Sequence, residues 1–125
     1  MTRHTLNWMA LFAAVALALP GVAAAAAPAM EKGGVLVDHN GMTLYTFDKD
    51  ADGKSMCNDD CAKNWPPLMV KAGDAAEGEW TQIKRSDGSM QWAYDGKPLY
   101  TFVKDKKDGD MTGDGMKDVW HAAKP

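Results

Sequence analysis

The two cysteines are the first residues that could carry chemistry. Cys57 and Cys61 stand four positions apart, and the chain has no other cysteine. A close, even pair in an exported protein favours a structural disulfide. Thiol–disulfide exchange is the alternative, but the intervening Asp59 and Asp60 disfavour the thiolate form that such chemistry needs. We therefore expect the pair to close a short structural loop.

An acidic loop leads into the cysteines and could bind calcium. Its candidate ligands have the spacing of an EF-hand-type loop, with Gly53 where the sharp turn requires a glycine; they are Asp48, Asp50, Asp52 and Asp59. The last of these stands where the motif has Glu, and Met56 occupies the ninth position. A calcium site is thus an alternative to a solvated acidic turn.

Sulfur and imidazole ligands offer a second metal hypothesis. Seven methionines follow the N-terminal apolar stretch, namely Met30, Met42, Met56, Met69, Met90, Met111 and Met116. Together with His39 and His121 they could bind copper, which prefers such ligands. No Met-x-Met or His-x-His spacing gathers them, so most are expected to be packing residues.

The sequence has no recognisable catalytic set. Ser55, Ser86 and Ser89 lack the Gly-x-Ser-x-Gly pattern, and no glycine-rich loop is suited to cradle a phosphate. Neither His39 nor His121 belongs to a motif that would place a nucleophile beside it. We expect a protein that is not an enzyme and has no resident cofactor, with calcium or copper as the only candidates.

A repeated segment must position these groups. Residues 41–50, GMTLYTFDKD, return as residues 96–105, GKPLYTFVKD, and the same offset of 55 residues carries Trp65 onto Trp120. In an extended strand, a Tyr and a Phe two residues apart point to one side, and the Leu before the Tyr points to the other. We predict one domain made of two copies of one unit.

The motif residues are predicted to be structural. They are Tyr45, Phe47, Asp50, Tyr100, Phe102 and Asp105. We expect the four aromatic side chains to pack inside the fold and the two Asp side chains to cap the turn after each strand. Trp65 and Trp120, at equivalent places, are expected to fill the open side of each hairpin.

Alternating apolar residues and turn signals predict an all-β fold of small antiparallel hairpins and a meander. Each Asn-Gly or Asp-Gly turn should join a hairpin, 35–39 with 42–47 and 90–94 with 97–103. Further strands are expected at 80–85 and 119–122, with a short helical turn within 57–64. The single domain should span 35–125, with repeats at about 35–70 and 90–125.

The Tyr-x-Phe-x-x-Asp pattern of both copies resembles the secreted, lipoprotein-like bacterial repeat family that has a Y-x-(F/W/Y)-x-x-D motif. The likeness extends to residues 57–62 with 65–68, to 91–96 and to 119–121. The resemblance implies export and a small repeat domain. It implies no catalytic residues, because the family has no established activity.

The N-terminus has the order of a secretory signal peptide. Arg3 and His4 precede an apolar run at 6–19, and small residues follow at 22–27. We expect a signal peptide at about 1–25 and a flexible lead-in at 26–34. A lipid anchor would need a cysteine just after the apolar run, so the mature chain is expected to have no membrane anchor and to be periplasmic, or alternatively secreted.

The charge balance bears on possible partners. The chain has 14 Lys and Arg against 17 Asp and Glu, a formal net charge of −3. This balance disfavours nucleic acid and anionic membranes, both of which reward clustered positive charge. We expect an exported, non-catalytic envelope protein, a binding or interaction module of unknown ligand that could have an envelope protein partner. The alternative is a metal-linked or redox accessory protein.

Overall fold

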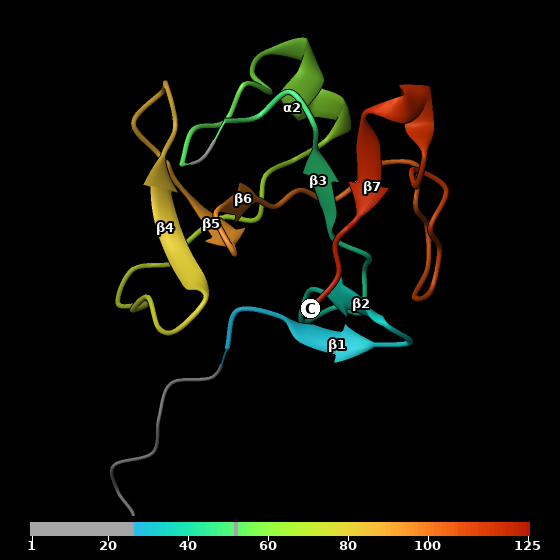
Figure 1. Ribbon diagram of the computed structural model, residues 1–125, viewed down its shortest axis with the longest axis horizontal. Helices are drawn as coiled ribbons and strands as arrows, with labels where there is room; N and C mark the ends of the chain where they lie inside the picture. The colour runs from blue at the N-terminus through green and yellow to red at the C-terminus, as the bar shows by residue number, and fades with distance from the viewer. Residues whose placement is uncertain (1–26, 52) are drawn as a thin grey trace, which may run out of the picture.

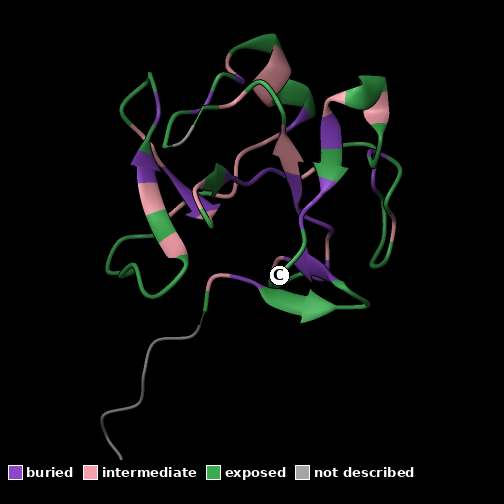
Figure 2. Cartoon of the chain, in the orientation of Figure 1, coloured by how far each residue is buried: buried purple, intermediate pink, exposed green. Residues whose placement is uncertain are grey.

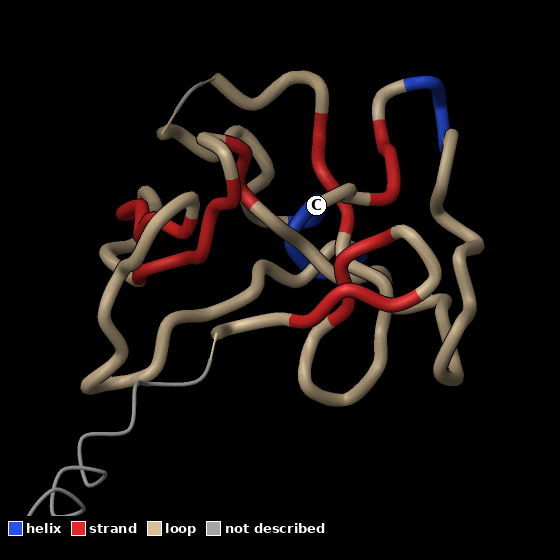
Figure 3. Tube along the Cα trace, turned by 60° about the horizontal axis from the view of Figure 1, so that its bottom comes forward, coloured by secondary structure: helices blue, strands red, loops and turns tan. Residues whose placement is uncertain are grey.

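The structure is a computed structural model that describes residues 27–51 and 53–125 (Figure 1). The predicted signal peptide and Asp52 lie outside these residues. The elements are β1 (Met30–Lys32), β2 (Val35–Val37), β3 (Tyr45–Phe47), α2 (Asp60–Asn64), β4 (Trp80–Lys84), β5 (Met90–Tyr94), β6 (Lys97–Pro98), the 3₁₀ turn η3 (Met116–Asp118) and β7 (Trp120–Ala122). Long loops join these short elements, as the trace in Figure 3 shows.

The strands form three small antiparallel sheets. β1 pairs with β2, β3 pairs with β7, and β4, β5 and β6 form a meander. The all-β prediction is therefore confirmed, and α2 lies within the segment where a helical turn was expected. No helix in the described part of the chain is long and apolar enough to span a bilayer.

The predicted first hairpin is confirmed only next to its turn, and its outer part pairs elsewhere. β3 lies beside β7 (Figure 1) and pairs with it, so that Phe47 is opposite Trp120 in the register. Between the expected hairpin arms there is an isolated bridge, Val37 to Thr43, with a bond from the Leu44 N–H to the Leu36 carbonyl of 2.9 Å. The arms separate after Leu44 because the backbone of the next residue bonds to the second repeat.

The predicted second hairpin is shorter than expected. β6 ends at Pro98, whereas the sequence suggested a strand over 97–103. The Leu99 N–H still donates to the Trp92 carbonyl at 3.0 Å, but the Tyr100 N–H donates to Tyr45 of the first repeat. As in the first repeat, the strand leaves its local partner at the motif tyrosine.

The segment 26–34, expected to be a flexible lead-in, contains strand β1. Met30 pairs with Val37 and Lys32 pairs with Val35, across a turn in which Gly33 and Gly34 have φ angles of 62° and 87°. All three residues of β2 are buried, so the backbone of this short strand requires hydrogen-bonded neighbours. β1 provides them on one edge, and the ordered domain therefore begins before residue 35.

Two apolar clusters lie on opposite sides of the motif strands. Figure 2 colours the buried segments of the chain purple. The aromatic cluster comprises Val35, Val37, Tyr45, Cys57, Trp65, Tyr100, Phe102, Trp120 and Ala122. The aliphatic cluster comprises Ala29, Leu36, Leu44, Leu99 and Ala123. The motif tyrosines and the leucines that precede them therefore point to opposite sides, as the period of two predicts.

Four aromatic rings form one continuous stack through the aromatic cluster. Trp65 and Trp120 are parallel within 3°, with ring centroids 3.8 Å apart. Phe102 stacks on Trp65 at 3.9 Å, and Phe47 stacks on Trp120 at 4.2 Å. Each tryptophan thus packs on the phenylalanine of the other repeat. The two tryptophans therefore share one core between the repeats, whereas the sequence suggested one ring at the open side of each hairpin.

Replacing Trp120 with Ala should lower the free energy of unfolding by about 3 to 5 kcal/mol, because it leaves a cavity in the middle of the stack. Trp120→Phe, which keeps a ring there, should cost less. Denaturant unfolding followed by circular dichroism measures both values. A Trp120→Ala midpoint equal to that of the parent protein would contradict the central place of this ring.

Candidate functional site

The two repeats meet at their motif tyrosines. The Tyr45 N–H donates to the Tyr100 carbonyl at 2.7 Å, and the Tyr100 N–H donates to the Tyr45 carbonyl at 3.0 Å. These residues occupy the same position in the two copies, so the contact is reciprocal. An approximate two-fold axis therefore passes between them.

The tyrosine hydroxyls are exchanged between repeats. The Tyr45 hydroxyl donates to Asp105 Oδ2 and the Tyr100 hydroxyl donates to Asp50 Oδ2, both at 2.6 Å. Both tyrosines are fully buried. The Asp of each Tyr-x-Phe-x-x-Asp motif therefore holds the Tyr of the other motif, and we call these two bonds the tyrosine–aspartate exchange.

The second oxygen of each aspartate stabilises its own loop. Asp50 Oδ1 accepts the Met56 N–H at 2.7 Å, and Asp105 Oδ1 accepts the N–H and the hydroxyl of Thr112. Each side chain thus caps the turn after its strand and also binds across the repeats. Sequence reasoning missed the cross-repeat bond. The available signal was the equal spacing of Tyr and Asp in the two copies.

Burial changes the acidity of these groups. It raises the pKa of Tyr45 and of Tyr100 far above the ordinary value, and the bond from each hydroxyl to an aspartate raises it further. Burial also raises the pKa of Asp50, although the hydrogen bonds from Tyr100 and from the Met56 N–H act in the opposite direction. The neutral phenol is therefore the stable form of both tyrosines.

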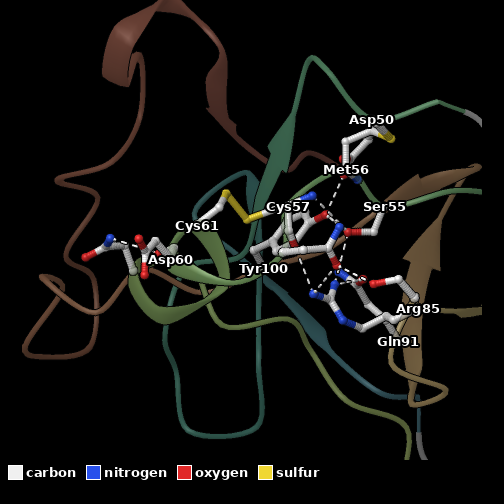
Figure 4. The surroundings of a disulfide bond; sticks show 12 residues. Asp50, Ser55, Met56, Cys57, Asp60, Cys61, Arg85, Gln91 and Tyr100 are labelled. Carbon is white, nitrogen blue, oxygen red and sulfur yellow. Dashed lines mark hydrogen bonds between the residues drawn. A yellow bond between two sulfur atoms is a disulfide. The ribbon is translucent and has the colours of Figure 1, made fainter.

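A buried arginine lies beside the bond between Tyr100 and Asp50 (Figure 4). Arg85 is 7% exposed, and its Nη1 donates to Ser55 Oγ at 3.0 Å and to Gln91 Oε1 at 2.8 Å. Its Nη2 donates to the Cys57 carbonyl at 2.7 Å and to Asn58 Oδ1 at 3.3 Å. All four acceptors are neutral, so hydrogen bonds satisfy this cation without a direct carboxylate partner.

Two hydroxyls, those of Ser55 and Tyr100, link Arg85 to Asp50, and the number of available protons fixes which group donates in each bond. The single proton of Tyr100 is donated to Asp50, so the Ser55 hydroxyl must donate to the Tyr100 oxygen, 2.6 Å away. Ser55 Oγ in turn accepts from Arg85. The buried cation and the carboxylate are therefore linked by a one-way chain of two hydroxyls, in which each bond polarises the next.

The second repeat closes its loop by other means. Thr112 and Met116 stand where the first repeat has Cys57 and Cys61, and the Tyr45 oxygen accepts the Gly113 N–H at 3.2 Å. A Cβ at Gly113 would lie 2.6 Å from the Trp65 ring. Glycine is therefore required there, because the loop passes directly against the aromatic stack.

The two cysteines are joined in a disulfide, with Cα atoms 5.2 Å apart. Cys57 is fully buried in the aromatic cluster, and Cys61 lies in α2 and is partly exposed. Burial in apolar surroundings disfavours a Cys57 thiolate as a leaving group. The environment is that of a structural bond.

The acidic loop does not assemble the predicted calcium ligands. Asp48 Oδ2 is 2.8 Å from His121 Nε2, and both oxygens of Asp50 accept hydrogen bonds within the fold. Asp59 is exposed at the start of α2 with a φ angle of 51°, and Asp52 lies outside the described residues. No three His, Cys, Asp or Glu side chains are grouped as metal ligands anywhere in the described chain.

The histidines proposed for copper have separate partners. His39 Nε2 is 2.7 Å from the Ala27 carbonyl, in the segment that leads into β1. His121 is paired with Asp48 beside β3. The two imidazole rings therefore bind different groups, and these contacts do not bring them together as ligands of one metal ion.

A hollow of about 490 Å³ lies outside the motif region. It is lined by Ala27, Pro28, Asp38, His39, Asn40, Leu68, Met69, Lys71, Asp74, Ala75 and Trp92. Trp92, Leu68 and Met69 supply most of the apolar surface, whereas Asp38, Asp74 and Lys71 bring charges of both signs. The lining comes from both repeats and from the linker between them, so sequence reasoning could not identify it.

Comparison with known proteins gives one match. A family model described as a secreted repeat of unknown function matches residues 29–69 and 81–124. The two matched segments correspond to the two repeats. No curated protein and no solved structure matches the chain.

Removing either motif hydroxyl should destabilise the fold. Tyr45→Phe and Tyr100→Phe should each lower the free energy of unfolding by about 1 to 3 kcal/mol, because a buried aspartate oxygen loses its donor. Tyr94→Phe is the matched control, since the Tyr94 hydroxyl makes no hydrogen bond to another described residue. Denaturant unfolding gives the three values, and equal costs at all three positions would contradict the exchange.

High pH should unfold the protein through the same tyrosines. Their folded pKa values lie above the ordinary value of 10.0, so the stability that they contribute is fully present below pH 10 and is lost as the pH rises beyond it. The free energy of unfolding, measured at increasing pH, should therefore fall above this value. Tyr45→Phe and Tyr100→Phe should each reduce the slope, and an unchanged slope in both variants would refute the assignment.

Proposed function

We propose that this chain, which belongs to the family of secreted repeats of unknown function, is a non-catalytic binding or interaction module of the bacterial cell envelope. The observation that carries the proposal is the tyrosine–aspartate exchange. Both motif tyrosines are buried, and each hydroxyl is bonded to the aspartate of the other repeat. The repeated motif thus serves to build a rigid scaffold.

The bonding of Ser55 supports a non-catalytic role. This hydroxyl is 7% exposed and donates its proton to Tyr100. It also accepts from Arg85 Nη1 and from the Cys57 N–H, so both lone pairs are engaged. A nucleophile needs an accessible lone pair and a nearby base, and Ser55 has neither in this arrangement.

The hollow over Trp92 is the candidate binding surface. Its volume of about 490 Å³ is within the range of small-molecule sites, which combine apolar walls with a few polar groups. Lys71 and His39 can donate hydrogen bonds to an occupant, whereas Asp38 and Asp74 can accept them. An amphipathic ligand or a peptide segment of an envelope partner suits such a lining.

The periplasm is the proposed compartment, with release to the medium as the alternative. The order of charged, apolar and small residues at the N-terminus supports export, and the family is described as secreted. A disulfide persists in oxidising compartments outside the cytosol.

A metal-linked or redox accessory role is the second candidate and has less support. Calcium at the acidic loop would have to displace the Tyr100 hydroxyl or the Met56 N–H from Asp50. Disulfide exchange would have to release the buried Cys57 as a thiolate. Metal analysis of protein purified from the periplasm separates this role from the first.

Photo-crosslinking in living cells tests the binding role. A photoreactive residue at Lys71, on the rim of the hollow, should give a discrete crosslinked product of higher mass. The same residue at Lys104, which is exposed but does not line the hollow, is the matched control. Equal products at the two positions, or none at Lys71, would argue against the hollow as the binding surface.

A further inference from the structure

Methionine dominates the exposed apolar surface. Five large hydrophobic side chains of the described chain are exposed, and four of them are Met30 at 49%, Met56 at 53%, Met69 at 43% and Met111 at 41%. Val103 is the fifth. Within residues 27–51 and 53–125, the leucines, the isoleucine and the aromatic residues are all at least partly buried, whereas these methionines are about half exposed.

The four exposed methionines lie outside the packed interior. Neither apolar cluster contains any of them, whereas Met116 packs against the aromatic cluster. Met42 and Met90 are also partly buried. A polar group added to one of the four exposed sulfurs would therefore displace no core contact.

Two of the exposed methionines are equivalent by the repeat. Met56 and Met111 are 55 residues apart, and each directly precedes the residue that closes its loop, Cys57 or Thr112. Asp50 fixes the loop at the Met56 N–H, and Asp105 fixes the other loop at the Thr112 N–H. These loops are held through the backbone, as Figure 4 shows for Met56 beside Asp50, and do not depend on the sulfur atoms.

The cysteines do not compete for sulfur oxidation. Both are already oxidised in the disulfide. The reduced sulfur of the described chain is therefore all in thioethers, and the most accessible of it is at the four exposed positions.

We propose that Met30, Met56, Met69 and Met111 are oxidation sites at which the protein consumes peroxides in the cell envelope without losing its fold. The thioether sulfur attacks one peroxide oxygen, an S–O bond forms and the O–O bond breaks. The departing hydroxide takes the remaining peroxide proton and leaves as water. The sulfur is oxidised by two electrons to the sulfoxide and the peroxide is reduced by two, and sulfoxide reductases can reverse the change.

Hydrogen peroxide titration of the mature, disulfide-bonded protein tests this assignment. Peptide mapping by mass spectrometry should find the first four oxygen atoms on the four exposed methionines, before Met42, Met90 or Met116 reacts. The thermal midpoint should stay unchanged up to that point. Oxidation of Met116 at the same rate, or unfolding with the first equivalents, would overturn the proposal.

A variant with all four exposed methionines replaced by leucine provides the matched control. It should keep the thermal midpoint of the parent and should lose the early uptake of four oxygen atoms. Uptake as fast as that of the parent would place the reactive sulfurs elsewhere and refute the assignment. The peptide map of the parent protein decides the question independently if the variant folds poorly.

Discussion

The exchange between Tyr45 and Tyr100 is the constraint on which the rest of the structure depends. At this point each repeat gives its backbone N–H and its buried hydroxyl to the other, and accepts the same groups in return. A buried hydroxyl or carboxylate without a partner is costly. Each repeat on its own would leave its motif tyrosine and aspartate without these partners. The two must fold together. The stack of Trp65 on Trp120 then fills the space that this crossing creates.

The two repeats have the same motif contacts, but the loop that follows the motif is held differently in each. The first loop is tied by the disulfide and held against Arg85, whose buried charge needs the acceptors that Ser55 and Cys57 provide. The second loop uses Thr112 against Asp105 and passes close to Trp65 at Gly113. The two loops are therefore equal in length but are closed by different interactions. Buried polar groups surround the loop of the first repeat, whereas the loop of the second repeat packs closely against an aromatic ring.

Local pattern predicted the elements and the pairing within the meander, but it could not predict the pairing across the repeats. Alternation placed Tyr45 and Leu44 on opposite sides, and the meander of β4 and β5 followed from turn signals. The same alternation is satisfied whether a strand pairs within its repeat or across it, so the pairing of β3 with β7 was out of reach. The burial of Arg85 was not predicted, because three of its four acceptors lie about thirty positions earlier in the chain. β1 was missed because its three residues are all exposed.

The crossing at the motif tyrosines has the symmetry of a homodimer contact, in which the same patch meets itself. Fusion of two such units through the exposed linker at 71–79 turns an association between molecules into a folding step within one molecule. Dilution can no longer separate the halves, and each half is free to diverge. A cysteine pair can then stand in one half alone, as it does here, while the fit between the halves is kept.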